Sequence, residues 1–517
     1  QLGGHSLMAM KMLSVVQKKF AVTIPIAAFF QEPTIQFILD LIRADEQREV
    51  KAIEPLSANN GLEEYVDLSF AQKRIWMQDQ LLNGSNAYNI PYAFRVKGEL
   101  DLQKLNDAIH FLITRHASLR TNFLTVEGEL KQRVLAPSAI QFAVAVTEME
   151  DCEEDSVLSL IDQKNSQTFD LEKDILFRCF VFHHGPMQST LLFIFHHIIM
   201  DELSSSIFGR ELLYLLEHGM EAFERNFSKL PIQYTDFVAW EKRQLWTDKL
   251  EEKRQYFRSK LQGDLPVINI ETDFPRPTEK SFAGASTSYE FSSEINQQLL
   301  ALCSAQGCSL FVLLTAITKT LLFRLSNQED IVMGTLEANR PHVDVESLIG
   351  CFFNVIPLRT IFNREDRFAD LLNVVKQQFF ETLDHANYPF DLLLHDLDIK
   401  TPPGRSPLFD VTVALKNLAE EDAPLQRIGN IELEQIHLPA DSCKYDLVFM
   451  FEKETDRLSL TLNYSTALFS ASTIDGYFEI LLTIINAVVN DPMIALYEIG
   501  NQETSLASPS IDSSFNF

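Results

Sequence analysis

The stretch FHHIIMDELS, residues 195 to 204, follows the apolar run TLLFI and precedes a segment with helical character. In an extended chain successive side chains point to opposite sides, so His196 and His197 cannot share one task. One of them faces a cleft while the other packs behind it. Asp201 can cap the helix that follows, or it can hold a ring or a loop in place through an ion pair. Taken alone, such a stretch is more often structural than catalytic.

A metal site is not predicted at this stretch. Adjacent histidines diverge, and neither an HExxH motif nor a third ligand is nearby. The remaining alternatives are therefore a strand end that is only structural and a strand end that presents one histidine to a substrate.

The composition of the 517 residues indicates a folded protein of several domains, roughly three by length. Lys and Arg number 44 against 72 for Asp and Glu, which gives a net charge of −28. Such a surface repels phosphates, so nucleic acid and anionic membranes are not expected as partners. No stretch approaches the roughly 18 apolar residues of a membrane span, and no signal peptide is recognised. The six cysteines are scattered without a CxxC pair, which favours reduced thiols in a cytoplasmic setting.

The first 45 residues are predicted to form a small helical unit. Apolar residues recur at three- and four-residue steps, at Leu7, Met10, Leu13, Val16 and Phe20. Ser6 follows two glycines at the start of this helix, where free N–H groups and the positive dipole end favour a phosphate on its hydroxyl. The alternative is that Ser6 only caps the helix. The chain begins at Gln1 within this motif, so we expect it to be part of a longer protein.

Residues 46–61 are polar and highly charged, and they are predicted to be a linker. Beyond it, helical and extended segments alternate irregularly, which predicts an α+β fold without giving the strand order. A charged stretch near the middle divides this region into predicted lobes at 62–238 and 239–495. The Ser-rich residues 496–517 are predicted to be a linker toward a further domain.

The N-terminal pattern resembles the second half of a peptidyl carrier domain from nonribosomal peptide synthetases. The resemblance rests on the order Gly-Gly-His-Ser, helix, VTIP, short helix, EPTI, helix. It implies a partial, all-α carrier domain in which a phosphopantetheinyl transferase attaches phosphopantetheine to Ser6. The first long helix of that family should precede Gln1.

The rest of the chain resembles the condensation domains of the same synthetases, which make antibiotics and other secondary metabolites. Seven motifs follow one another in the order of that family: LSFAQKRIWMQDQL, RHASLRTNF, FHHIIMDELS, YTDFVAW, IGCFFNVIPLR, HANYPFD and GRSPLFDV. The resemblance implies two chloramphenicol-acetyltransferase-like lobes in a V. It also implies an amide-forming acyltransferase, in which the amine on a downstream carrier attacks the thioester on an upstream carrier. The carrier with Ser6 would be the upstream donor, and the C-terminal tail would lead to an adenylation domain.

The family's HHxxxDG motif assigns roles to the central stretch. The resemblance implies that His197 is the catalytic histidine and that His196 and Asp201 shape the loop. Asp201 would pair with an arginine, for which Arg340 in EANRP is our choice. The other candidates are Arg74, Arg115 and Arg120.

The remaining motif residues are expected to be structural or to line the channel, Asn354 and Tyr234 among them. Glu202 stands where the family has a glycine. It can turn outward as a residue of the first helical turn, which the dipole favours, or narrow a channel.

Related subfamilies are less consistent with the sequence. The two-aspartate pattern of heterocyclisation domains and the glutamate-bearing motifs of epimerisation domains are not seen. The alternative function is that of a catalytically altered, condensation-like module that binds or recruits another enzyme. Both histidines and Asp201 argue against that alternative, and Glu202 argues for it.

Overall fold

The structure is a computed structural model that describes most of the two lobes. The described residues are 12, 16, 19–20, 29, 34–44, 52–56, 65–81, 84–149, 153–244, 247–417, 425–440, 442–454 and 457–500. Ser6 and most of the predicted linkers at 46–61 and 496–517 lie outside these residues. Within the predicted carrier region, helix α3 spans Ile35–Ala44.

The first lobe is built on a six-stranded sheet with the order β12-β13-β2-β7-β6-β5. Its strands are antiparallel to their neighbours except for β5, which runs parallel to β6. Strand β7 is buried from its second residue to its last, as an apolar central strand covered on both faces should be. The strands are β2 (Asn89–Lys97), β5 (Ala145–Glu148), β6 (Phe177–Gly185), β7 (Gln188–His196), β12 (Leu425–Ile428) and β13 (Ile431–Ile436).

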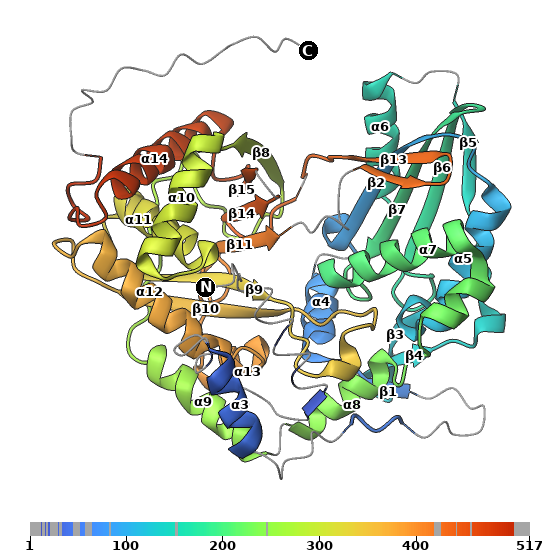
Figure 1. The fold of residues 1–517 in the computed structure, drawn as a ribbon, viewed down its shortest axis with the longest axis horizontal. Coiled ribbons are helices and arrows are strands. Elements are labelled where there is room, and N and C mark those ends of the chain that lie inside the picture. Colours follow the sequence, from blue (N-terminus) through green and yellow to red (C-terminus); the bar gives the residue numbers. More distant parts are fainter. Residues whose placement is uncertain are drawn as a thin grey trace.

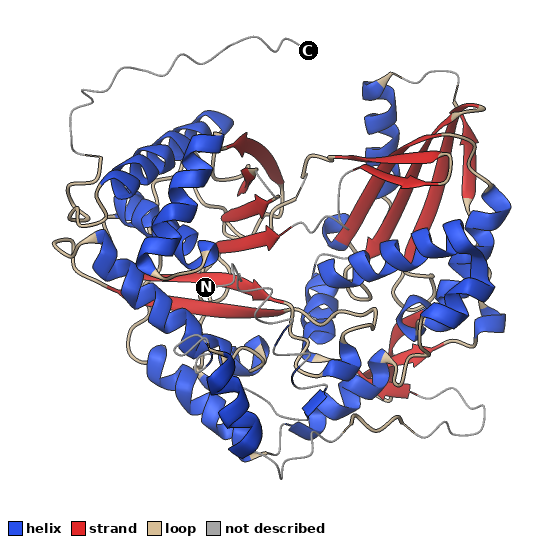
Figure 2. Ribbon diagram, in the orientation of Figure 1, coloured by secondary structure: helices blue, strands red, loops and turns tan. Residues whose placement is uncertain are grey.

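Helices cover this sheet, as Figure 2 shows. Helix α7 packs on β7 through Phe208, whose ring lies 5.4 Å from that of Phe193 and 5.1 Å from that of Phe195. The helices of this lobe are α5 (Leu102–Arg115), α6 (Glu154–Asn165) and α7 (Glu202–Asn226). Their apolar faces and the sheet form one continuous core.

The second lobe has its own six-stranded sheet with the order β10-β9-β11-β14-β15-β8. Strand β11 runs parallel to both β9 and β14, and the other pairs are antiparallel. The strands are β8 (Gly284–Glu290), β9 (Asp330–Glu337), β10 (Asn354–Ile361), β11 (Val411–Asn417), β14 (Leu447–Lys453) and β15 (Leu458–Ser465). The helices are α10 (Ser293–Gln306), α11 (Leu310–Ser326), α12 (Phe368–Leu383) and α14 (Ala471–Asn490).

Helix α14 is long and apolar enough to cross a membrane by length and composition alone. Its residues Ile474, Leu481 and Ile485 are fully buried in the second core, together with residues of α11. We therefore interpret α14 as a core helix of this lobe.

Smaller elements accompany the two large sheets. A three-stranded sheet of order β1-β4-β3 accompanies the first lobe. These elements are β1 (Tyr65–Asp67), β3 (Thr121–Val126), β4 (Glu129–Val134), α4 (Phe70–Leu81), α8 (Tyr234–Gln244), α9 (Asp248–Lys260), α13 (Phe390–Asp396), η1 (Asn86–Tyr88), η2 (Ala117–Arg120), η3 (Pro137–Ala139) and η4 (Val343–Val345).

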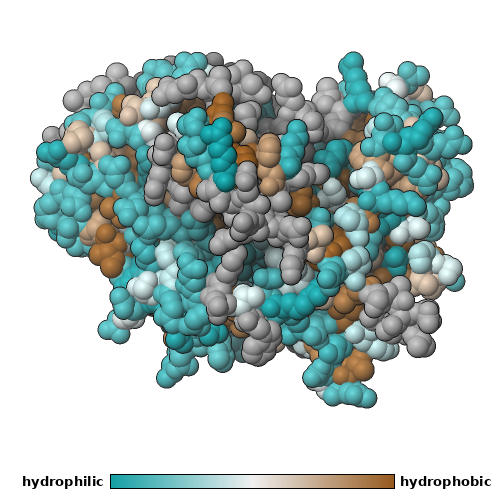
Figure 3. All heavy atoms as spheres, turned by 60° about the horizontal axis from the view of Figure 1, so that its bottom comes forward, coloured by the Kyte–Doolittle hydropathy of each residue, from teal (hydrophilic) through white to brown (hydrophobic). Residues whose placement is uncertain are grey.

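The two large sheets lie beside each other, and the lobes join at one end and diverge toward the other, as in a V (Figure 1). The α+β class and the two-lobe arrangement expected from the sequence are confirmed. The face seen from the closed end is mainly hydrophilic, with scattered apolar groups (Figure 3).

The lobes are not built from two uninterrupted halves of the chain. Residues 425–436, which fall within the predicted second lobe, form β12 and β13 and extend the sheet of the first lobe. Strand β13 pairs with β2 from Glu432 opposite Lys97 to Ile436 opposite Ala93. Without this pairing the edge of β2 would leave a row of backbone groups unpaired.

Candidate active site

Two neighbouring histidines lie at the end of β7, at the junction of the lobes. The strand ends at His196, which is 1% exposed, and the following residues turn into α7. His197 lies in that turn and is half-buried. The two side chains therefore occupy different environments, as the alternation along a strand predicts.

The ring of His197 is fixed in one orientation. Its Nδ1 lies 2.7 Å from the carbonyl oxygen of Met200, and its backbone N–H donates to the carbonyl oxygen of Tyr88 at 2.8 Å. The ring stacks on Phe353 with centroids 4.8 Å apart. Because a carbonyl oxygen only accepts, Nδ1 carries the hydrogen and Nε2 keeps a lone pair.

The surroundings of His197 disfavour its protonated form. Burial lowers the pKa of His197 to about 3, and the positive charge of Lys444 contributes to the same shift. The imidazole is therefore neutral near pH 7, and Nε2 is a hydrogen-bond acceptor.

His196 lies on the other side, within the first core. Its Nδ1 accepts a hydrogen bond from the backbone N–H of Ile198 at 3.3 Å, and its ring lies near those of Tyr88 and Phe169. Its Nε2 is 3.9 Å from Asp79 Oδ1, too long for a hydrogen bond. Burial lowers the pKa of His196, so this ring is also neutral. Its contacts are those of a structural residue.

Asp201 both caps α7 and forms an ion pair. Its Oδ1 accepts from the backbone N–H of Ser204 at 2.8 Å, and its Oδ2 accepts from that of Phe352 at 3.0 Å. Arg340 Nη2 lies 3.3 Å from Asp201 Oδ1, and the two side chains are 7% and 5% exposed. Arg340 also donates to the carbonyl oxygens of Val345 and Leu348. The aspartate thus ties the start of α7 to the second half of the chain.

The other candidate arginines have different partners. Arg74 lies 3.5 Å from Asp391, and Arg115 lies 3.1 Å from Glu211. Arg120 donates from Nε to the carbonyl oxygen of Ile113 at 3.2 Å. The structure therefore pairs Asp201 with Arg340 among the four candidates.

Four consecutive residues of the second half, 349–352, are held by side chains of the first half. Each of these residues contributes at least one backbone group to a hydrogen bond with such a side chain, and Gly350 contributes both its N–H and its carbonyl oxygen. The pairs are Ser118 Oγ with Ile349 O at 2.7 Å, Ser204 Oγ with Gly350 O at 2.8 Å, Tyr234 OH with Cys351 O at 2.5 Å, and Asp201 Oδ2 with Phe352 N at 3.0 Å. This junction places the loop before β10 directly against the start of α7.

Tyr234 and Asn354 have structural roles in this arrangement. The buried ring of Tyr234 lies against Gly350, where a Cβ would be 2.1 Å from the ring. Asn354 donates from Nδ2 to the carbonyl oxygens of Ala386 and Tyr388, at 2.8 and 2.6 Å. It thereby fixes the loop that leads into α13.

Glu202, at the first position of α7, points toward the second lobe. Its Oε1 lies 2.5 Å from Lys416 Nζ on β11, and the hydroxyl of Tyr92 on β2 is 3.4 Å from Oε2. The Glu202 side chain is 56% exposed. The residue that replaces the family glycine therefore meets a lysine of the opposite lobe.

Several residues of the site were not identified from the sequence. Ser204 is fully buried, and its oxygen contacts Gly350 and Arg340 together. Lys444 and Tyr88 also border the histidines, and Lys444 Nζ lies 4.3 Å from the centroid of the Tyr88 ring. No local spacing signals these residues, because their roles come from contacts between segments that are distant in the sequence.

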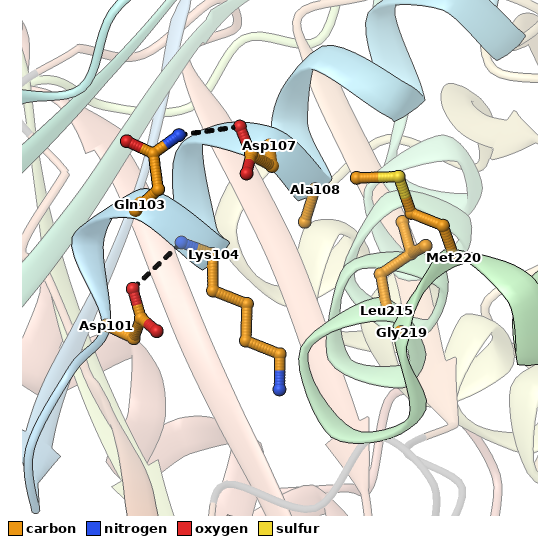
Figure 4. Close-up of a pocket in the computed structure, with 8 residues that line it drawn as sticks. All are labelled: Asp101, Gln103, Lys104, Asp107, Ala108, Leu215, Gly219 and Met220. Carbon is orange, nitrogen blue, oxygen red and sulfur yellow. Dashed lines mark hydrogen bonds between the residues drawn. The ribbon is translucent and has the colours of Figure 1, made fainter.

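A separate hollow lies between α5 and α7 (Figure 4). It is lined by Asp101, Lys104 and Met220 among others, near the kink at Gly219. Gly219 is 17 residues beyond Glu202, which corresponds to roughly 25 Å along a helix. The hollow is therefore remote from the histidines.

Two family models match the chain. Residues 62–502 match the condensation domain, and residues 1–42 match the phosphopantetheine attachment site. The chain is 32% identical over 499 residues to tyrocidine synthase 3 of Brevibacillus parabrevis, which covers 96% of this chain and 7% of that protein. It is 32% identical over 500 residues to bacitracin synthase 3 of Bacillus licheniformis, covering 96% of this chain and 8% of that protein. The chain thus spans less than a tenth of the length of these two relatives.

Solved structures share the fold. The X-domain from teicoplanin biosynthesis gives a TM-score of 0.77 at 21% identity, covering 87% of this chain and 99% of that one. A four-domain nonribosomal peptide synthetase bound to AMP and glycine also gives 0.77, at 20% identity, covering 86% of this chain and 34% of that one. At these identities the likeness concerns the fold alone.

Proposed function

The chain belongs to the condensation domains of nonribosomal peptide synthetases, which form peptide bonds, and on that premise we propose that the bond is made beside His197. The observation that supports this proposal is the tautomer and protonation state of the His197 ring. Its Nδ1 is engaged by Met200, and its neutral Nε2 remains an acceptor at the junction of both lobes.

In the proposed reaction an amine attacks the carbonyl carbon of an acyl thioester. The C–N bond forms, the C–S bond breaks, the amine loses one proton, and the sulfur leaves as a thiol. Nε2 of His197 accepts a hydrogen bond from the attacking amine and directs its lone pair toward the carbonyl carbon. It is also an acceptor for the proton that the amine loses.

The groups around His197 keep its ring in the productive orientation. The Met200 carbonyl selects the tautomer, and the Phe353 ring supports the imidazole plane. The Asp201–Arg340 pair fixes the start of α7 and so the turn that contains His197. We assign these residues a positioning role.

The phosphopantetheine attachment match indicates a covalently bound phosphopantetheine. We propose Ser6 as its attachment point, with a phosphopantetheinyl transferase as the modifying partner. The bound group supplies a thiol that carries the acyl chain as a thioester. We further propose that this carrier is the upstream donor, that the acceptor arrives on a downstream carrier, and that an adenylation domain follows. A cytoplasmic location agrees with the free thiols of Cys179, Cys303, Cys308, Cys351 and Cys443.

Single-turnover transfer tests the central proposal. The purified chain is mixed with a pool of aminoacyl-pantetheine thioesters and with soluble aminoacyl amides, and dipeptide amides are detected by mass spectrometry. We expect a dipeptide product with the wild type and a strongly reduced yield with His197→Ala. A folded wild type that yields no dipeptide from the pool would contradict the proposal.

The carrier assignment has a separate test. A phosphopantetheinyl transferase and coenzyme A should add one phosphopantetheine to the protein, as measured by intact mass. We expect Ser6→Ala to abolish the mass increase, and a persisting increase in that variant would assign the group to another residue.

A further inference from the structure

The proposed reaction needs a positive group that His197 does not supply. When the amine adds to the thioester, the former carbonyl oxygen becomes an oxyanion, and preorganised donors or cations at that oxygen contribute strongly to the rate. The neutral ring of His197 has one N–H, and it donates this N–H to the carbonyl oxygen of Met200. The donor to the oxyanion must therefore come from another residue.

Lys444 extends from the second lobe to Tyr88 of the first lobe. Its Nζ lies 4.3 Å from the centroid of the Tyr88 ring. The carbonyl oxygen of the same Tyr88 accepts the backbone hydrogen bond from His197. Lys444 and His197 thus contact the same residue of the first lobe, Lys444 through the Tyr88 ring and His197 through the Tyr88 carbonyl oxygen.

The segment that carries Lys444 is anchored on both sides. The backbone N–H of Cys443 donates to Phe282 O at 2.9 Å, and that of Asp446 donates to Asp410 O at 2.8 Å. The ring of Tyr445 stacks on Phe409, with centroids 5.7 Å apart. Lys444 therefore extends from a fixed backbone, which a preorganised charge requires.

Lys444 has no carboxylate partner among the residues that the structure describes. No described Asp or Glu oxygen lies within 4 Å of its Nζ, and the side chain is half-buried. The nearby Arg74 is a second cation, and its carboxylate partner is Asp391. Lys444 is therefore a cation without a paired carboxylate among the described residues, which suits an anion that forms only during the reaction.

Burial lowers the pKa of Lys444 to about 8, with a further contribution from Arg74. The ammonium form therefore prevails at pH 7. The titratable or charged groups that act on Lys444 or respond to its charge are Arg74, His196, His197, Cys351 and Cys443, and its ammonium group also lies over the ring of Tyr88.

We propose that Lys444 is a further catalytic residue, whose ammonium group donates a hydrogen bond to the oxyanion formed from the thioester carbonyl. This inference rests on the proposed function and adds the residue that acts on the thioester carbonyl. His197 acts on the amine, and Lys444 acts on the carbonyl oxygen. The two groups belong to different lobes, so the site is complete only when the lobes are held together.

The test compares Lys444→Met and Lys444→Arg with the wild type in the single-turnover transfer assay. Lys453→Met is the matched control, because it removes one lysine at the far end of β14, nine residues on. We expect Lys444→Met to lower the rate by about 10²-fold, as removal of an oxyanion donor does, and Lys444→Arg to retain most of the activity. The control should transfer at the wild-type rate.

The pH profile separates a catalytic role from a structural one. The wild-type rate should fall above a pH of about 8, where Lys444 loses its proton, and Lys444→Arg should remain active to higher pH. Thermal unfolding of each variant verifies that it is folded.

The two proposals fail in different ways. A folded Lys444→Met variant that matches the wild-type rate and profile would overturn the role of Lys444 alone. A wild type that forms no dipeptide would overturn the proposed function and this inference with it.

Discussion

Glu202 and Lys416 form an ion pair that bridges the two lobes beside the candidate active site, with 2.5 Å between Oε1 and Nζ. Glu202 begins α7 directly after Asp201, and Lys416 lies on β11 of the second sheet. Their side chains are 56% and 35% exposed, so the pair contributes little to stability. Because the pair lies between the lobes, we expect its removal to affect substrates more than stability.

We predict that Glu202→Gly changes substrate preference more than stability. The substitution removes a side chain and a negative charge between the lobes, so transfer should improve more for bulky or anionic substrates than for small neutral ones. Single-turnover rates over a substrate series measure the effect. Glu154→Gly, at the first position of α6, is the matched control. Equal changes for all substrates would place Glu202 outside the path.

We predict that His197→Ala loses transfer by about 10² to 10⁴-fold while the protein stays folded and binds the carrier. The half-buried ring makes one side-chain hydrogen bond, so its loss costs little stability. His196→Ala and Asp201→Ala should also lower the unfolding midpoint, because both side chains are buried. Transfer and thermal unfolding are measured for all three variants. Near-normal transfer by folded His197→Ala would refute its catalytic role.

We predict that Arg340→Met destabilises the protein by about 3 to 5 kcal/mol. The change leaves the carboxylate of Asp201 buried at 5% exposure without its cation. Urea unfolding measures the loss, and Arg95→Met, which breaks exposed pairs with Glu154 and Glu434, should leave the midpoint nearly unchanged. Similar effects from both variants would contradict the importance of the buried pair.

We predict that Gly350→Ala is strongly destabilising, by about 2 to 4 kcal/mol, because the new Cβ would lie 2.1 Å from the ring of Tyr234. Gly209 in α7 and Gly476 in α14 are controls of the same chemistry, since a Cβ at either meets nothing within 4 Å. Alanine at these helical positions should be neutral or stabilising. Differential scanning calorimetry ranks the three variants, and an unaffected Gly350→Ala would refute the close packing.

We predict that His196 and His197 make a contribution to the free energy of unfolding that falls as the pH drops below about 6.5. Burial lowers the pKa of His196 and His197 in the folded state, so the unfolded chain binds protons that the folded chain does not. Each such histidine costs up to about 1.4 kcal/mol per pH unit, for His197 between pH 6.5 and about 3. His197→Gln should flatten the dependence, whereas His395→Gln, with a side chain that is 87% exposed, should not. A slope unchanged by His197→Gln would contradict the prediction.

The local features of the fold were predictable from the sequence. The order of strand, turn and helix around residues 195–204 follows from an apolar run, two polar residues and a capping aspartate. The α+β class follows from the mixture of periodicities along the chain. These signals depend on neighbouring residues, which is why they can be read without a structure.

The long-range features were not predictable in the same way. The pairing of β13 with β2 joins residues about 335 positions apart, and nothing in either strand specifies its partner. Four arginines were candidates for Asp201, and only the resemblance favoured Arg340, which lies 139 positions away. No sequence pattern pointed to Lys444. Its proposed role depends on its contact with the Tyr88 ring and on the absence of a carboxylate partner among the described residues.

The strands that cross from the second lobe to the first have a consequence for recombination. A chimera joined at residue 238 would combine β2 of one parent with residues 425–436 of the other. Its first sheet would then contain strands from both parents, and the register of β13 on β2 would depend on side chains from both parents. Exchange of the whole domain preserves this pairing, whereas exchange of one half must carry the crossing strands with it. A recombination that keeps the first sheet intact should therefore exchange the complete domain and not a single lobe.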